Sequence, residues 1–147
     1  MKTAVRYWEQ TQAITLRSAS ILTRFFAGWL PFWACNALIL KGALLPPSQI
    51  PRFLHRFNDK LIHGVEFFLL FWAAFNAFRL AKSAWIKHSG ILAFGWCCFM
   101  GVLTEIVQFF VKGRTSDVSD LRADALGAGL GLILYGLWRF RQYTRPH

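Results

Sequence analysis

The residues best suited to chemistry begin with a short acidic and histidine-containing segment. Asp59 and His63 are four positions apart, and Glu66 follows three positions later. In a helix this spacing places all three side chains on one face. Carboxylates beside an imidazole can transfer protons or bind a cation, so this face is the first candidate for a site.

Two further polar groups share the same kind of spacing. Glu105 and Gln108 are three positions apart, which again places them on one helical face. The aspartates after position 116 lie at relative positions 0, 3 and 7, and a single arginine in the preceding turn is a natural partner for them. These residues are Arg114, Asp117, Asp120 and Asp124.

The residue types leave three chemistries open. One is acid–base catalysis on a phosphoester or amide, in which Arg114 holds an anionic group and His63 and Glu105 exchange protons. Other residues would then orient these groups or contact the substrate. A second is proton transfer in a small transporter. A divalent metal is the least favoured, because H-x-x-E and E-x-x-Q are not established ligand spacings, and we predict no metal ligands. The orienting residues would be Asp120 and Asp124, and the substrate contacts Asp59, Glu66, Gln108, Arg114 and Asp117.

Structural interpretations stand beside these. Asp59, Asp117 and Asp120 lie where they could simply cap helix starts and complement the helix dipole. Lys60 is expected to contact lipid headgroups. Gly127 and Gly131 form a G-x-x-x-G step that is typical of close helix packing. No nucleophile elbow, phosphate-binding loop or dinucleotide turn is present.

The elements that must position these residues are apolar helices. The 147-residue chain is 55% hydrophobic and 16% charged, which excludes a disordered chain and disfavours an ordinary soluble domain. Four apolar segments, at about 25–45, 59–78, 90–111 and 119–138, are long enough to cross a bilayer as helices. They lack the recurring polar face of a soluble bundle. We therefore expect an all-α, four-helix transmembrane domain over residues 25–140.

The net charge of +10 predicts the orientation of these spans. Basic residues precede the first segment, separate the second from the third and follow the fourth, so the positive-inside rule predicts cytoplasmic N- and C-termini. Six of the seven carboxylates, all but Glu9, then share the extracytoplasmic side. Because the positive charge flanks the spans, no nucleic-acid partner is expected. Residues 1–24 are expected to be an interfacial segment and not a signal peptide, and residues 141–147 a basic cytoplasmic tail.

The motifs resemble those of the VanZ-like family of bacterial integral membrane proteins. Asp59-Lys60-x-x-His63 is similar to that family's D-K-x-x-H opening. Glu105-x-x-Gln108-x-Phe110 is similar to its E-x-x-Q-x-F stretch. Gly113-Arg114 followed by the three aspartates resembles its G-R-x-x-[DE]-x-x-D ending. One departure is Asp124, where many members have Asn.

The resemblance implies a multi-pass protein of the bacterial cytoplasmic membrane, in a family named for resistance to the glycopeptide teicoplanin. We expect a polar extracytoplasmic pocket that acts on or binds a cell-envelope component, such as a lipid-linked or peptidoglycan precursor or a lipid headgroup. Whether it is an enzyme stays open, as do a non-catalytic scaffold and a small proton-coupled transporter. Membrane lipids and a second copy of the chain are the other expected partners.

Overall fold

The computed structural model describes residues 22–23, 25–50, 58–80, 88–115 and 117–143, and all of its regular elements are helical. A π-helical turn, Phe25–Trp29, leads into α2, Leu30–Leu44. A short 3₁₀ turn, Pro47–Gln49, precedes α3, Asp59–Leu80, and then follow α4, Ser89–Phe109, and α5, Val118–Tyr143. The expected all-α class is therefore confirmed. The segment expected at the interface, up to residue 21 and at 24, and the tail residues 144–147 lie outside the described residues.

Local sequence explains where the helices begin and end. Pro31 stands in the first turn of α2, directly after the π-helical turn, and Pro46 and Pro47 follow the end of α2, where proline cannot continue a helix. At the start of α3, the side chain of Asn58 accepts a hydrogen bond from the backbone N–H of Lys60 at 2.9 Å. The last helix continues to Tyr143, beyond the expected end near 138, and Arg141 in its last turn suits the negative end of the helix dipole.

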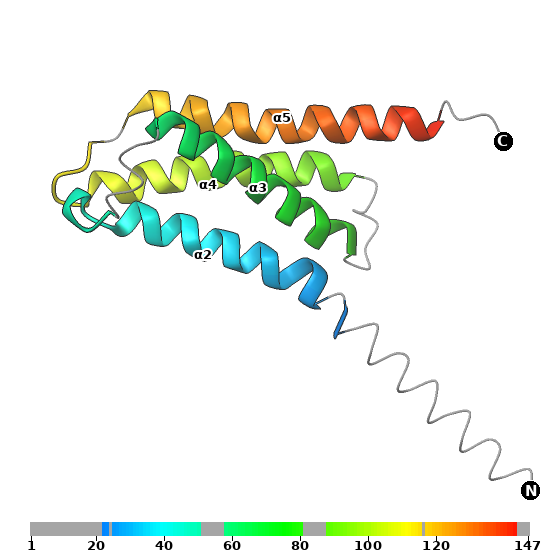
Figure 1. The fold of residues 1–147 in the computed structure, drawn as a ribbon, viewed down its shortest axis with the longest axis horizontal. Helices are drawn as coiled ribbons and strands as arrows, with labels where there is room; N and C mark the ends of the chain where they lie inside the picture. Colours follow the sequence, from blue (N-terminus) through cyan, green and yellow to red (C-terminus); the bar gives the residue numbers. More distant parts are fainter. Residues whose placement is uncertain (1–21, 24, 51–57, 81–87, 116, 144–147) are drawn as a thin grey trace, which may run out of the picture.

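The helices form a bundle in which α3 is central. It contacts α2, α4 and α5, and α4 also contacts α2 and α5. Figure 1 shows the consequence: the ends of α2 and α4 and the starts of α3 and α5 lie at the same end of the bundle, on the left of the view. This shared end, which we call the polar end, carries the residues with candidate chemistry.

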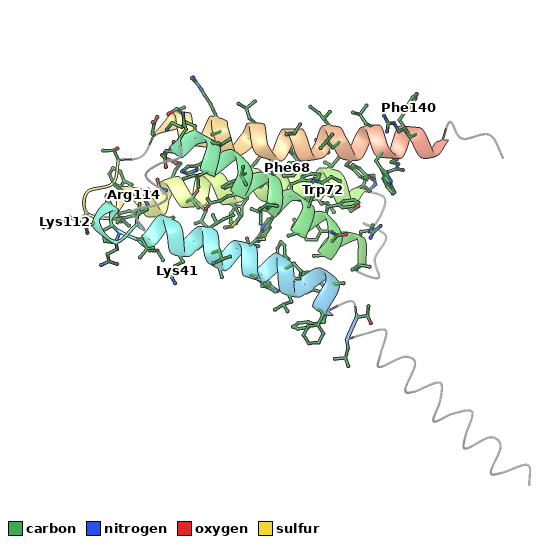
Figure 2. All side chains as sticks on the ribbon, viewed as in Figure 1. Lys41, Phe68, Trp72, Lys112, Arg114 and Phe140 are labelled. Carbon is green, nitrogen blue, oxygen red and sulfur yellow. The ribbon has the colours of Figure 1, made fainter. Side chains whose placement is uncertain are left out.

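The interior is filled by aromatic and aliphatic side chains. Phe67, Leu70 and Phe71 of α3 are almost fully buried, and Met100 of α4 and Phe32 of α2 pack against this cluster. Figure 2 shows side chains also projecting outward along the whole bundle. Many of the outward ones are large and apolar, including Leu38, Ile91 and Leu126, which are each more than two-thirds exposed at 69%, 68% and 75%.

Within the described residues, two helices, α3 and α4, are long and apolar enough to cross a membrane. Of the other two, α2 has only 15 residues, and the first turns of α5 carry Asp120, Arg122 and Asp124. Length and composition alone therefore indicate two membrane-spanning candidates.

Candidate functional site

A cavity of about 420 Å³ opens at the polar end of the bundle. Its apolar wall comes from the end of α2, the following turn and the side chains of Ile62 and Phe67. Its polar wall contains five of the residues singled out in the sequence. These are Asp59, His63, Glu66, Gln108 and Arg114.

His63 joins the cavity to a buried carboxylate on another helix. Its Nδ1 atom lies 2.9 Å from Oδ1 of Asp124, a hydrogen bond between α3 and α5. His63 is 8% exposed and Asp124 is 2% exposed. The Nε2 atom on the other side of the ring lies 4.0 Å from Oδ2 of Asp120 and makes no hydrogen bond to the described residues. Asp124 thus fixes the ring orientation, as an orienting carboxylate does in acid–base and metal sites.

Lys60 also belongs to the cluster of polar side chains around His63, and the sequence did not single it out as a site residue. Its ammonium Nζ forms ion pairs with Asp120 and with Asp117, the latter at 2.9 Å. The signal available in the sequence was its position beside Asp59, at the start of the same helix. Because lysine near a helix end usually extends to the membrane surface, the sequence favoured a headgroup contact. Here Lys60 instead links α3 to the start of α5.

Glu105 does not line the cavity. Its Oε2 atom accepts a hydrogen bond from the backbone N–H of Asp117 at 2.9 Å, just before α5 begins. A carboxylate near a helix N-terminus satisfies an orphan N–H and complements the positive dipole end. Glu105 therefore holds α4 to the start of α5, and this contact is structural.

Arg114 faces the cavity and also closes the end of α2. Its Nε donates to the carbonyl of Leu45 at 3.3 Å, and its Nη2 donates to that of Gly42 at 3.1 Å. The turn before it depends on Gly113, whose φ of +83° is a conformation that other residues adopt only with strain. Its Nη1 makes no hydrogen bond to the described residues.

Asp117 lies at the surface as the cap of α5. Its side chain accepts hydrogen bonds from the hydroxyl and the backbone N–H of Ser119, at 2.5 Å and 2.8 Å. These bonds, followed by the Lys60 ammonium, hold the pKa of the Asp117 carboxyl well below its usual range. The residue is exposed and does not line the cavity.

The two glycines expected at a packing surface lie between α3 and α5. A Cβ added at Gly127 would come within 2.0 Å of the carbonyl oxygen of Gly64, and one added at Gly131 within 2.5 Å of the Phe71 ring. The backbones of the two helices therefore approach closely beside His63. This close approach allows His63 and Asp124 to meet.

The structure thus divides the candidate residues into three groups. The first group surrounds the His63 ring. Three of its members could ligate a metal ion, because their ligand atoms all lie within 4.8 Å of one another: Asp59, His63 and Asp120. A second group, Glu66, Gln108 and Arg114, occupies the remaining polar wall of the cavity. Glu105 and Asp117 form the third, at the start of α5 and outside the cavity.

The fold and site define a small, all-helical protein with an apolar exterior and a polar cavity at one end. Comparison with known proteins assigns it more narrowly: the VanZ/LLP1 family profile matches residues 2–139, so the chain belongs to this membrane-associated family. An uncharacterised protein of the fission yeast Schizosaccharomyces pombe (strain 972 / ATCC 24843) is 35% identical over 88 residues, or 60% of this chain and 52% of that protein. The chain therefore spans about half the length of this relative. No solved structure matches it.

Proposed function

We propose that this protein is a four-span membrane protein whose polar cavity binds the headgroup of a phosphorylated envelope lipid. The observation that carries the proposal is the cavity itself: about 420 Å³, with Arg114 and two carboxylates on its polar wall, at the end of an otherwise apolar bundle. A cavity of this size suits a headgroup, since small-molecule sites of about 300–1,000 Å³ are usual.

The exposed side chains support insertion of all four helices. Large apolar residues are more than half exposed on every one of them, for example Trp33, Leu69, Phe99 and Ile133. So extensive an apolar surface is unusual on a soluble monomer and normal against lipid. In the proposed topology both termini are cytoplasmic and the polar end faces the extracytoplasmic side. A fluorescent protein fused after residue 147 should then fluoresce, and alkaline phosphatase fused there should be inactive; active phosphatase would contradict this topology.

The polar wall offers complementary groups for such a headgroup. Nη1 of Arg114, which makes no hydrogen bond within the described residues, suits an anionic oxygen, since guanidinium binds phosphate through charge-assisted hydrogen bonds. Asp59 and Glu66 can accept hydrogen bonds from hydroxyl or ammonium groups of the same ligand. His63, held in place by Asp124, also lines this wall and presents a polar ring nitrogen to the ligand side.

Native mass spectrometry of the purified protein tests the proposal. Phosphatidic acid and undecaprenyl phosphate are each compared with an uncharged lipid of the same chains, diacylglycerol or undecaprenol. We expect tighter binding of the phosphorylated lipids than of the uncharged ones. Whichever phosphorylated lipid binds more tightly identifies the ligand as a glycerolipid or as a lipid carrier. Arg114→Gln should remove this preference. Lys112→Gln is the matched control, because Lys112 is exposed in the same turn (Figure 2).

Equal binding of charged and uncharged lipids by the unchanged protein would contradict the proposal. Because Arg114 also closes α2, its variant is compared only if its elution profile and melting temperature match those of the control. If they do not, Gln108→Leu tests the same wall without removing that contact. In a bacterial host, the same variants should change susceptibility to teicoplanin if the bound lipid belongs to the cell-wall pathway.

A second candidate function is that of a non-catalytic scaffold for another envelope protein. The observation favouring it is that Arg114, Glu105 and Asp117 already stabilise helix ends. Under this alternative, variants of cavity residues should lose cellular function only in proportion to their loss of folded protein.

A further inference from the structure

Beside this cavity we infer a binding site for a divalent metal ion of the Zn²⁺ or Mn²⁺ type, held by Asp59 and His63, which line the cavity, and by Asp120 next to them. The inference deepens the proposed function, since a cation there would lie beside the bound headgroup. Imidazole and carboxylate together are ligands that suit these ions. Their ligand atoms all lie within 4.8 Å of one another, on the starts of two helices.

The strongest argument is the orientation of the His63 ring. When its Nδ1–H donates to Asp124, Nε2 carries a lone pair. Nε2 lies 4.0 Å from Oδ2 of Asp120, which is longer than a hydrogen bond of about 2.7–3.2 Å. Two ligands on one ion with bonds of about 2.0–2.2 Å can lie up to about 4 Å apart, so both atoms can bind the same ion.

The Nε2 atom of His63 is available to a ligand. His63 is only 8% exposed, and its Nε2 makes no hydrogen bond to the described residues. Since His63 also lines the cavity, this nitrogen is open to an ion arriving from the aqueous side.

The charges around the ring favour a cation as well. Three carboxylates, Asp59, Asp120 and Asp124, surround His63, and Lys60 is the one basic side chain that forms ion pairs with this group in the part of the chain described. Lys60 contacts Oδ1 of Asp120, which leaves Oδ2 for the ion. Asp124 then plays the outer-sphere role in which a carboxylate orients a metal-bound histidine.

Titration calorimetry of the chelator-treated, lipid-free protein tests the site with Zn²⁺, Mn²⁺ and Mg²⁺. We expect one Zn²⁺ or Mn²⁺ per chain, bound more tightly than Mg²⁺, and a melting temperature that rises with the bound ion. Asp59→Asn, at the exposed rim, and Asp120→Asn should each weaken binding at least about tenfold, and Asp124→Asn about 10–100-fold. Asp117→Asn is the matched control, because it also removes a Lys60 ion pair but no proposed ligand.

X-ray absorption at the zinc edge should show one imidazole and at least two oxygen ligands. Absence of stoichiometric binding, or binding that Asp59→Asn and Asp120→Asn leave unchanged, would overturn the inference. Loss of metal binding alone would leave the phosphate preference of the lipid assay intact. Loss of that preference with metal binding retained would instead overturn the proposed lipid function.

Discussion

His63 and Asp124 are hydrogen-bonded across two helices, with 2.9 Å between Nδ1 of the imidazole and Oδ1 of the carboxylate. The other carboxylate oxygen, Oδ2, is buried and has no hydrogen-bond partner among the described residues. One bond therefore fixes both side chains between α3 and α5. The surrounding contacts give four predictions.

The first concerns Asp124. Asp124→Ala leaves the buried His63 Nδ1 without its partner, and should destabilise the protein by about 1–3 kcal/mol. Asp124→Asn should cost less, because the amide oxygen can still accept from Nδ1. Thermal unfolding in detergent measures both. Equal stability of the alanine variant and the unchanged protein would show that the bond contributes nothing to folding.

The second concerns the close approach of α3 and α5. Gly127→Ala places a methyl group 2.0 Å from the Gly64 carbonyl, so the helices must move apart, at about 1–3 kcal/mol. Gly129→Ala is the control, because a Cβ there meets nothing within 4 Å, and its better helix propensity should stabilise by up to about 1 kcal/mol. We expect Gly127→Ala to lower the melting temperature and Gly129→Ala to raise it, relative to the unchanged protein. Similar shifts for the two variants would argue against the contact.

The third concerns Lys60. Lys60→Gln removes the cation beside Asp120, whose side chain is 8% exposed, and should destabilise by about 1 kcal/mol. The magnitude is modest because the lysine side chain is itself 39% exposed. Lys41→Gln provides the comparison, since Lys41 projects outward from α2 (Figure 2) and makes no ion pair in the described structure. Chemical denaturation should give a lower free energy of unfolding for Lys60→Gln than for Lys41→Gln.

The fourth concerns pH and Asp117. Its pKa is lower in the folded protein than in the unfolded chain, where the pKa of aspartate is about 3.9. The stabilisation is therefore complete above about pH 4 and is lost as the pH falls further through the folded value. Asp117→Asn should be less stable than the unchanged protein from pH 7 down to about pH 5, and the difference should disappear at the acid end. A difference that grows on acidification would have the wrong sign.

Part of this site could be predicted from helical periodicity. The spacing of Asp59 and His63, and of Asp120 and Asp124, places each pair on one face, and the alternation of apolar segments brings both faces to one end. The roles within the site could not be assigned this way. Periodicity did not show that Glu105 accepts a hydrogen bond at the start of α5, or that Lys60 pairs with Asp120. Proton exchange by Glu105 stays a prediction.

The sequence by itself determined the helical class, the family and which residues share a helix face, because these depend on composition and on a period of 3.6 residues. Only the tertiary structure decided which faces meet. The rotation of α5 against α3 depends on where two glycine backbones can touch, and that contact places Asp124 on Nδ1 of His63 and leaves Nε2 facing Asp120. Such pairings depend on packing between segments some sixty residues apart, and no local pattern encodes them.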